Sequence, residues 1–404
     1  MGPPLRAARA GAARHRVVKI LLVSEVYPPR AGGAGWSTRA LALALREAGH
    51  RVAVVTSSPG PPNLDGLDVR RLSVRGRKRL VVPRAFATHV ASEDEAVLHA
   101  QHSLSALGCL AGDRPRRVAV TVRDHWPVCF WSTRISQGAL CPGCGTGPMT
   151  RCVKGRVGAP GPLAWGAIPY MKADLAEKRS ALRRAGAILA VSEAIAAELG
   201  AAGLSRVEVL PNMVDAAETR ALASPEPSFA LPARFLLFVG KLEENKGVRL
   251  LVPAVAGAGT GLPLVVLGEG SLAHALKFDA AAAGVSLVLR GWAHREDVLR
   301  AMARATAIVF PSLWPEPLSR VLLEALALGT PVAAMDTGGT REILEDGRGG
   351  LVVEGAAALS EAVGRLGRDE GLRRRLAEGA RQRAEAFSPA ALVPRYEAVY
   401  RRLR

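Results

Sequence analysis

The chain has 404 residues, more than a single hydrophobic core usually supports, so its length predicts two domains. Its composition, 49% hydrophobic and 22% charged, is that of a globular protein, and no apolar run reaches the roughly 18 residues that a membrane-spanning helix needs. The formal net charge of +18 is concentrated near the N-terminus, where residues 1–90 hold 16 Lys and Arg against four Asp and Glu. Such a surplus attracts polyanions: nucleic acid, anionic lipid or a phosphate-bearing substrate.

Residues 1–16 are basic, and no apolar segment of the kind found in signal peptides follows them. We therefore expect a disordered basic leader and a cytoplasmic protein. The densest basic run, RGRKR at 75–79, is either a solvated loop or, with Trp36, part of a surface that docks on the anionic inner face of the plasma membrane. Nucleic acid is not expected as a partner, because no zinc-finger spacing or basic zipper accompanies the charge.

A strand, a glycine loop, a helix and a second strand follow one another after the leader. The run VVKILLVSEVYPP at 17–29 is apolar and ends in a turn, which is typical of a strand buried on both faces. The glycines of RAGGAGW at 30–36 form a loop, an amphipathic helix follows it, and RVAVVTS at 51–57 is the next strand. The pattern recurs at 95–102, 116–125, 186–200 and 207–215, which predicts a Rossmann-like domain over residues 17–215.

The same alternation begins again after a linker. Residues 216–234 carry three prolines and no strand pattern, whereas buried strands are predicted within 235–255, 262–270, 285–292, 307–314 and 329–336. Residues 235–385 are therefore a second Rossmann-like domain, and residues 386–404 form a basic helix that we expect to cross back to the N-terminal domain. The fold class is α/β, with two doubly wound domains facing a central cleft and ligand loops at the carboxyl ends of the strands.

Two carboxylates flank the start of one helix in PEPLSRVLLEALALGTPV, residues 315–332. Prolines on both sides of Glu316 hold it in a non-helical turn, and the helix should begin near Leu318 or Ser319. The free N–H groups and the dipole of that helix end would favour a phosphate beside Glu316, and Glu324 could reach the same pocket. The alternative is structural: Glu324 could merely pair with Arg320, four residues earlier, on the helix surface.

This element, E-x7-E followed by EALALGTPV and a second glycine loop at 338–339, resembles the family 4 type of retaining nucleotide-sugar glycosyltransferases, which have the GT-B fold. The resemblance covers essentially the whole chain. It implies that Glu316 binds hydroxyls of the donor sugar and that Glu324 binds the ribose. It also assigns the backbone of Leu318 and Ser319 to the donor, and Ser stands here where the family often has Gly.

The loop GKLEENKG at 240–247 resembles the family segment whose basic pair holds the diphosphate. Lys246 matches, and Lys241 stands where Arg is common, which keeps the charge but loses the bidentate fork. Positive groups there would stabilise the charge that builds on the leaving diphosphate. Because the chain has no D-x-D motif, we expect neither a catalytic metal nor another cofactor. The alternative for each lysine is a solvated surface charge.

Three further segments resemble family sites. The glycines Gly32 and Gly33 would bring backbone N–H groups to the donor phosphate and acceptor, and Gly268 of VLGEG would leave room for a close backbone approach. LRGW, with Arg290 and Trp292, resembles the segment that contacts the nucleotide base, although Trp292 could equally be a core residue.

One segment departs from the family pattern. Many relatives have His-Asp at the end of the strand that here reads TVRDHW, and that His has been assigned a part in the reaction. Arg123 fills the His position, Asp124 matches, and His125 comes one residue later, so either the loop re-aims His125 or Asp124 suffices. His99 and His102 end another strand and are expected to be satisfied or exposed histidines.

The sequence thus predicts a retaining hexosyltransferase of glycan or cell-envelope biosynthesis. It would move a sugar from a UDP- or GDP-type donor to a glycan, lipid-linked or small-molecule acceptor that the first domain binds. The resemblance implies front-face displacement, in which the donor phosphate helps to deprotonate the acceptor. The alternatives are a related epimerase or phosphorylase and a non-catalytic binding module. No Schiff-base lysine for a phosphorylase can be assigned, and the set of Glu316, Glu324 and Lys246 argues against lost catalysis.

Four of the five cysteines lie in a glycine-rich insertion at 129–152, which shows little helix or strand pattern. They are Cys129, Cys141, Cys144 and Cys152, with the spacing C-x11-C-x2-C-x7-C. Clustered cysteines in a cytoplasmic chain favour metal over disulfides, and four thiolates around zinc would make a structural site. Free thiols, disulfides and an iron–sulfur cluster remain alternatives. Cys109 is predicted to be a buried core residue.

Overall fold

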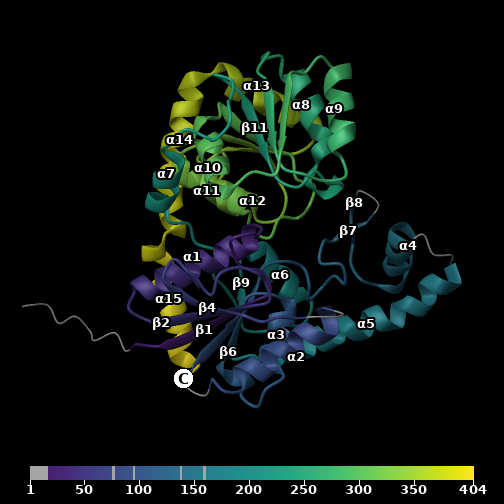
Figure 1. Cartoon of the computed structure of the whole chain (residues 1–404). Helices are drawn as coiled ribbons and strands as arrows, with labels where there is room; N and C mark the ends of the chain where they lie inside the picture. Colours follow the sequence, from purple (N-terminus) through teal and green to yellow (C-terminus); the bar gives the residue numbers. More distant parts are fainter. Residues whose placement is uncertain (1–16, 75–77, 94–95, 137–138, 158–160) are drawn as a thin grey trace, which may run out of the picture.

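The computed structural model describes residues 17–74, 78–93, 96–136, 139–157 and 161–404, and these form two α/β domains, one above the other in Figure 1. The α/β class and the two Rossmann-like domains predicted from the sequence are confirmed. The expected leader at 1–16 and most of the basic run at 75–79 lie outside the described residues. Among the described helices, none is long and apolar enough to cross a membrane.

The first sheet has eight strands, ordered β10-β9-β6-β5-β1-β2-β4-β3, and is parallel except for the β3–β4 pair. Its strands are β1 (Lys19–Ser24), β2 (Arg51–Thr56), β3 (Asn63–Leu64), β4 (Leu67–Arg71), β5 (Val97–Ala100), β6 (Val118–Val122), β9 (Ala187–Ala190) and β10 (Val207–Val209). The central strands β5 and β6 are buried at every residue, because helices cover both faces of the sheet. The strand order reverses between β1 and β5, so the ligand loops leave the sheet at that point.

The second sheet has six parallel strands, ordered β13-β12-β11-β14-β15-β16. They are β11 (Leu236–Val239), β12 (Leu264–Leu267), β13 (Leu287–Gly291), β14 (Ala307–Phe310), β15 (Val332–Met335) and β16 (Leu351–Val353). The strand order reverses between β11 and β14, whose carboxyl ends therefore open the second ligand crevice. The sequence analysis missed β16, which has only three residues between glycine-rich turns.

Helices cover both sheets. Those of the first half are α1 (Gly33–Glu47), α2 (Lys78–Val90), α3 (Ser103–Leu110), α4 (Thr146–Val157), α5 (Gly161–Arg184), α6 (Glu193–Ala201) and α7 (Ala216–Ala223). Those of the second half are α8 (Leu251–Ala258), α9 (Ala273–Ala282), α10 (Arg295–Arg304), α11 (Arg320–Leu328), α12 (Thr340–Leu344), α13 (Ala356–Arg368), α14 (Glu370–Ala384) and α15 (Pro389–Arg402). Four short 3-10 helices are η1 (Pro115–Arg117), η2 (Glu244–Lys246), η3 (Val248–Leu250) and η4 (Glu385–Phe387). Residues 216–234, taken as a linker, thus begin with a helix that packs on α10 and α11.

The insertion after β6 is more regular than its sequence suggests. It contains the hairpin of β7 (Ile135–Ser136) and β8 (Ala139–Leu140), followed by α4, and α4 packs on the long helix α5. Figure 1 shows α4 and the outer part of α5 projecting away from the two domains. The prediction of little helix here was wrong, because glycine and proline residues hide the helical periodicity of 146–184.

The C-terminal helix α15 lies against the first domain, as its path in Figure 1 shows. Its Tyr396 and Tyr400 belong to the same buried cluster as Ile20 of β1 and Leu189 of β9. The hydroxyl of Tyr400 lies 2.8 Å from Nδ1 of His99, whose Nε2 is 2.7 Å from the hydroxyl of Thr121. Burial lowers the pKa of His99 to about 3, so this histidine is a neutral core residue.

Candidate active site

A cavity of about 1020 Å³ lies between the two domains, at the carboxyl ends of both sheets. The first domain contributes the loop of Gly32, and the second contributes Lys241, Gly268 and Trp292. Four residues selected from the sequence thus share one cavity. Added to Gly32, a Cβ atom would meet nothing within 4 Å, so this backbone is open to a ligand.

Glu316 and Lys246 form an ion pair in the second domain, with Nζ 2.6 Å from Oε1. The hydroxyl of Ser312 also donates to Oε1, at 2.7 Å, and the ammonium lies 4.4 Å from the ring centroid of Trp314. Glu316 is only 4% exposed. The carboxylate is thus held by two donors, and Ser312 and Trp314 are site residues that the sequence analysis did not single out.

The loops that carry this pair are joined by their backbones. The N–H groups of Leu313 and Trp314 both donate to the carbonyl of Asn245, at 3.1 and 2.8 Å. Gly247 has a φ of +66°, and a Cβ atom there would collide with the carbonyl of Pro311. A glycine after Lys246 is therefore required for the two loops to meet.

The second glycine loop explains why Glu316 keeps its conformation. Gly338 has a φ of +54°, and a Cβ atom on it would overlap the backbone of Glu316. The N–H of Gly339 donates to the carbonyl of Glu316 at 2.7 Å. The glycines at 338–339 thus let one loop cross directly over the other.

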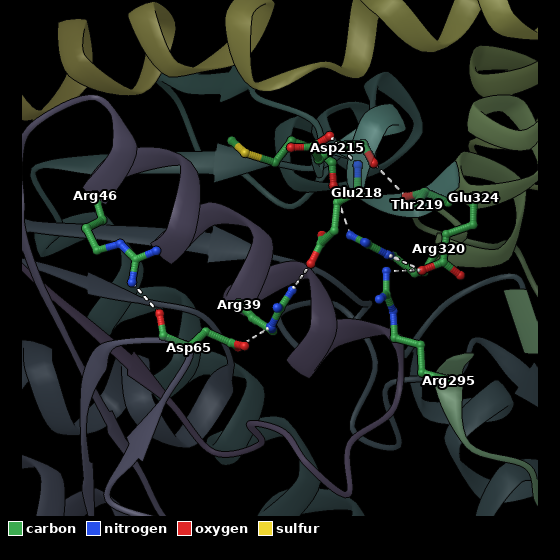
Figure 2. A network of polar contacts seen from close by, with 10 residues as sticks. Arg39, Arg46, Asp65, Asp215, Glu218, Thr219, Arg295, Arg320 and Glu324 are labelled. Carbon is green, nitrogen blue, oxygen red and sulfur yellow. Dashed lines mark hydrogen bonds and ion pairs between the residues drawn. The ribbon is translucent and has the colours of Figure 1, made fainter. Parts of the chain in front are cut away.

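Glu324 is buried on α11 and is held by two arginines (Figure 2). Nε of Arg320 lies 2.9 Å and Nη2 of Arg295 lies 3.1 Å from its Oε1. Glu324 does pair with Arg320, as the i, i+4 spacing allowed. The pair does not lie on the surface, because the side chains of Glu324, Arg320 and Arg295 are only 7–8% exposed. The guanidinium of Arg295 also stacks over Trp36 of the first domain at 4.9 Å, which places Trp36 at the contact between the domains.

Figure 2 also shows a second set of contacts across the domain boundary. Arg39 of α1 lies between Asp65 and Glu218 of α7, at 2.6 and 2.7 Å, and Arg320 donates to the carbonyl of Met213 at 2.9 Å. Gly33 packs on Arg320, whose Cβ would be 3.0 Å from an added Cβ atom. Gly33 therefore serves the contact between the domains, in contrast to the open Gly32.

The helix α11 starts at Arg320, with Ser319 at the N-cap position and Leu318 buried before it. Ser319 thus stands at the N-cap position, but its side chain makes no capping hydrogen bond. The Ser319 side chain therefore leaves the N–H groups of the first turn of α11 unoccupied. Helix N-termini that bind anions have such N–H groups available.

Two residues expected at the nucleotide base differ in placement. Trp292 is 53% exposed and lines the cavity, so it is not a core residue, and its backbone N–H donates to the carboxylate of Glu269 at 3.1 Å. Arg290 donates to the carbonyl of Ala230 at 2.9 Å and stacks on Phe229, and it is not among the residues that line the cavity. Gly268 is fixed by packing, because an added Cβ atom would collide with the carbonyl of Gly240.

His125, two residues after the family His position, connects the two domains beside the turn that carries Glu316. Its Nε2 donates to the carbonyl of Pro315 at 2.8 Å, and its Nδ1 lies 2.6 Å from a carboxylate oxygen of Glu198. Arg123, at the family His position, is buried and donates to the side-chain oxygens of Gln101 and Asn212. Burial lowers its pKa to about 10.

Asp124 accepts the N–H of Trp126 at 2.8 Å, and burial raises the pKa of this carboxyl. Beside it lies Glu25, which the sequence analysis did not select. Oε1 of Glu25 accepts N–H groups in the first turn of α3, and burial raises its pKa to about 7. Lys178 of α5 belongs to the same cluster, and burial lowers its pKa to about 8. Only the fold brings these three groups together, since they lie in the loops after β1 and β6 and on α5.

The four insertion cysteines line one small cavity. The thiol of Cys144 lowers the pKa of Cys129 to about 5, assisted by the backbone N–H groups of Trp131, Thr133 and Arg134. Within the described ranges, no group of three or more His, Cys, Asp or Glu side chains is arranged to hold a metal ion. Cys109 is buried in the core of the first domain, and His102 is half-buried, with the pKa of its ring lowered to about 3 by desolvation.

Comparisons with known proteins agree with this architecture. Two family models match in series: Glycosyltransferase Family 4 over residues 31–218, and Glycosyl transferases group 1 over residues 219–383. A glycogen synthase from Mycobacterium tuberculosis (strain CDC 1551 / Oshkosh) is 29% identical over 383 residues, covering 91% of this chain and 90% of the relative. A 2-deoxystreptamine glucosyltransferase from Streptomyces kanamyceticus is 35% identical over 182 residues, which is 41% of this chain and 46% of the relative.

Solved structures share the fold at low sequence identity. Sucrose-phosphate synthase from Thermosynechococcus elongatus has a TM-score of 0.71 and 20% identity, with 95% of this chain and 99% of that chain covered. Anabaena HepE in complex with UDP and glucose has a TM-score of 0.68 and 18% identity, with 94% and 98% covered.

The two parallel sheets, with a cleft at their carboxyl ends, define a GT-B protein. The chain belongs to the family 4 type of GT-B glycosyltransferases, and it is a glycosyltransferase enzyme.

Proposed function

We propose that this enzyme transfers a sugar from a UDP- or GDP-type nucleotide donor, with retention of the anomeric configuration, to a glycan, lipid-linked or small-molecule acceptor. One observation carries the proposal: the Lys246–Glu316 pair and the uncapped start of α11 are on the loops that follow β11 and β14, where the strand order reverses. Such a crevice is where doubly wound sheets bind their ligands.

In the proposed mechanism, the donor occupies the cavity with its base toward Trp292 and its ribose toward Glu324. Lys241, Lys246 and the N–H groups of α11 face the diphosphate. Glu316, held by Lys246 and Ser312, accepts hydrogen bonds from sugar hydroxyls. As the glycosidic C–O bond breaks, negative charge develops on the diphosphate, and these donors stabilise it without a metal.

The acceptor side is proposed to lie between the domains, near Asp124 and Gly32. His125 is buried and bonded to Pro315, so we assign it a positioning role: it holds the turn that carries Glu316. The relatives support a nucleotide donor. HepE structures contain UDP and UDP-glucose, and several related proteins have names of sugar transferases or synthases.

The net charge of the first domain supports one finer proposal, a peripheral contact with anionic membrane. Residues 125–173 contain five Lys and Arg and no Asp or Glu, and they include the projecting helix α4. Each basic residue near an anionic surface adds about 1 kcal/mol to binding. A lipid-linked acceptor would be presented at such a surface.

The experiment that tests the proposed function is a screen of nucleotide sugars with candidate acceptors, followed by NMR of the product. We expect one donor to give product with the donor's own anomeric configuration. Inverted product would contradict retention. Release of nucleotide without any glycoside would indicate hydrolysis only, and interconversion of the donor sugar would favour the epimerase alternative.

A further inference from the structure

Four cysteines that are distant in sequence surround one cavity in the insertion. Cys129 follows β6, Cys141 and Cys144 follow β8, and Cys152 lies on α4. Their thiols are free, and the cavity is closed from below by Met149 and Met171. The fold has thus gathered all four thiols of this segment at one place.

The loop that carries Cys129 is closed by its own backbone. The N–H of Ser132 donates to the carbonyl of Cys129 at 3.0 Å, and Cys129 is buried. Arg134 has a φ of +51°, a left-handed conformation that is unusual for a residue other than glycine. This turn holds Cys129 at the cavity, and the thiolate of cysteine is the form that binds metal ions.

We propose that Cys129, Cys141, Cys144 and Cys152 bind one zinc ion. Four thiolates fill the tetrahedral coordination of zinc, which makes a structural site with no position for a substrate. Since the described side chains form no assembled metal group, binding would draw the four thiols together around the ion. The ion would fasten the loop of Cys129 and the turn after β8 to α4, beside the small core of Met149, Val153, Ile168, Met171 and Leu175.

The site is connected to the glycosyltransferase cleft by a chain of polar contacts. The N–H of Cys141 donates to the carbonyl of Arg134 at 2.7 Å, and the guanidinium of Arg134 donates back to the carbonyl of Cys141 at 3.2 Å. The same guanidinium pairs with Glu198, which holds His125, and His125 donates to Pro315 beside the sugar-binding glutamate. The metal would therefore fix the position of Arg134 and, through it, the turn at Pro315.

The experiment begins with metal analysis of protein purified without chelator or added zinc. We expect about one zinc per chain. The variant Cys141→Ser/Cys144→Ser should lose the metal, whereas Cys109→Ala, which removes a thiol from the core on α3, should retain it. Chelator should lower the Tm of the wild type and of Cys109→Ala by equal amounts and leave the double variant unchanged.

A second measurement keeps the inference testable if the double variant does not fold. Chelator-stripped wild type titrated with Co²⁺ should show the intense thiolate-to-cobalt absorption of a tetrahedral site, with saturation at one ion per chain. Metal-free protein with unchanged Tm in chelator, or a Cys129–Cys144 disulfide in the purified protein, would overturn the proposal. Neither measurement uses a sugar donor, so the outcome is independent of the proposed function.

Discussion

Replacement of Lys246 by Met tests how the buried Glu316 is stabilised. Methionine keeps an apolar stem against Trp314 but removes the ammonium that lies 2.6 Å from the carboxylate. The carboxylate, 4% exposed, would then be left with the Ser312 hydroxyl alone. Removal of one partner of a buried ion pair costs about 3–5 kcal/mol, and since Lys246 is 22% exposed and water can partly replace it, we expect a loss of about 2–3 kcal/mol.

The reverse change should be far milder. Glu316→Gln leaves a lysine that can reach water and stays over an aromatic ring, so its cost should be about 1 kcal/mol or less. The double variant carries no buried charge and should recover most of the stability that Lys246→Met loses. All three variants should lose turnover by about 10² or more, because each lacks part of the donor site.

Urea unfolding followed by circular dichroism measures these differences, with the transition of the second domain fitted separately. A Lys246→Met variant as stable as the wild type would refute the reasoning. A double variant no more stable than Lys246→Met would do so as well, because the loss could not then come from an unpaired carboxylate.

Three further changes test other parts of the structure. Gly338→Ala should lower turnover strongly, because its Cβ would overlap the Glu316 backbone. The control Gly347→Ala, also at positive φ but in open space, should lower only stability. Equal turnover of the two variants would contradict this prediction. Burial raises the pKa of Glu25 from 4.5 to about 7, so this carboxyl takes up a proton on folding. In denaturant titrations, the stability of the wild type should therefore fall as pH rises from 4.5 to 7. Glu25→Gln should lack this slope and be more stable at pH 8 by up to roughly 3 kcal/mol, and parallel curves would refute the prediction. Flotation with vesicles should show that the protein binds anionic but not neutral lipid at low salt. Replacement of both Arg151 and Lys154 on α4 by Glu should weaken this binding. Equal recovery with both lipids would exclude a membrane-binding surface at α4.

The sequence predicted the fold well because its strands are apolar runs with few polar interruptions. The strands β1, β6, β11 and β14 are such runs, and each ends at or just before a proline, a glycine or a polar residue. The arm of α4 and α5 escaped prediction because Pro169 and many glycines interrupt its pattern. Tertiary packing on α3 compensates for those residues, and no local pattern reveals it.

The site was predictable where one segment carries the chemistry. Glu316, Glu324 and Lys246 could be selected from motifs, but the contact of His125 with Pro315 depends on how two domains meet. The same is true of Glu342, whose carboxylate accepts N–H groups of Glu193 and Ala194 at 2.7 and 2.9 Å across the boundary. Such pairs have no fixed spacing in the sequence, so only a structure identifies them.

The central claim is that the cavity between the domains binds a nucleotide-diphosphate sugar. Its most direct test is thermal and denaturant unfolding of wild type, Glu324→Ala and the surface control Phe278→Ala with a panel of UDP-, GDP- and related sugars. We predict that one nucleotide stabilises the wild type and Phe278→Ala by about 2.7 kcal/mol at 100 times its Kd, while Glu324→Ala responds much less at the same concentration. No stabilisation by any nucleotide in the panel, or an equal response from Glu324→Ala, would contradict the claim.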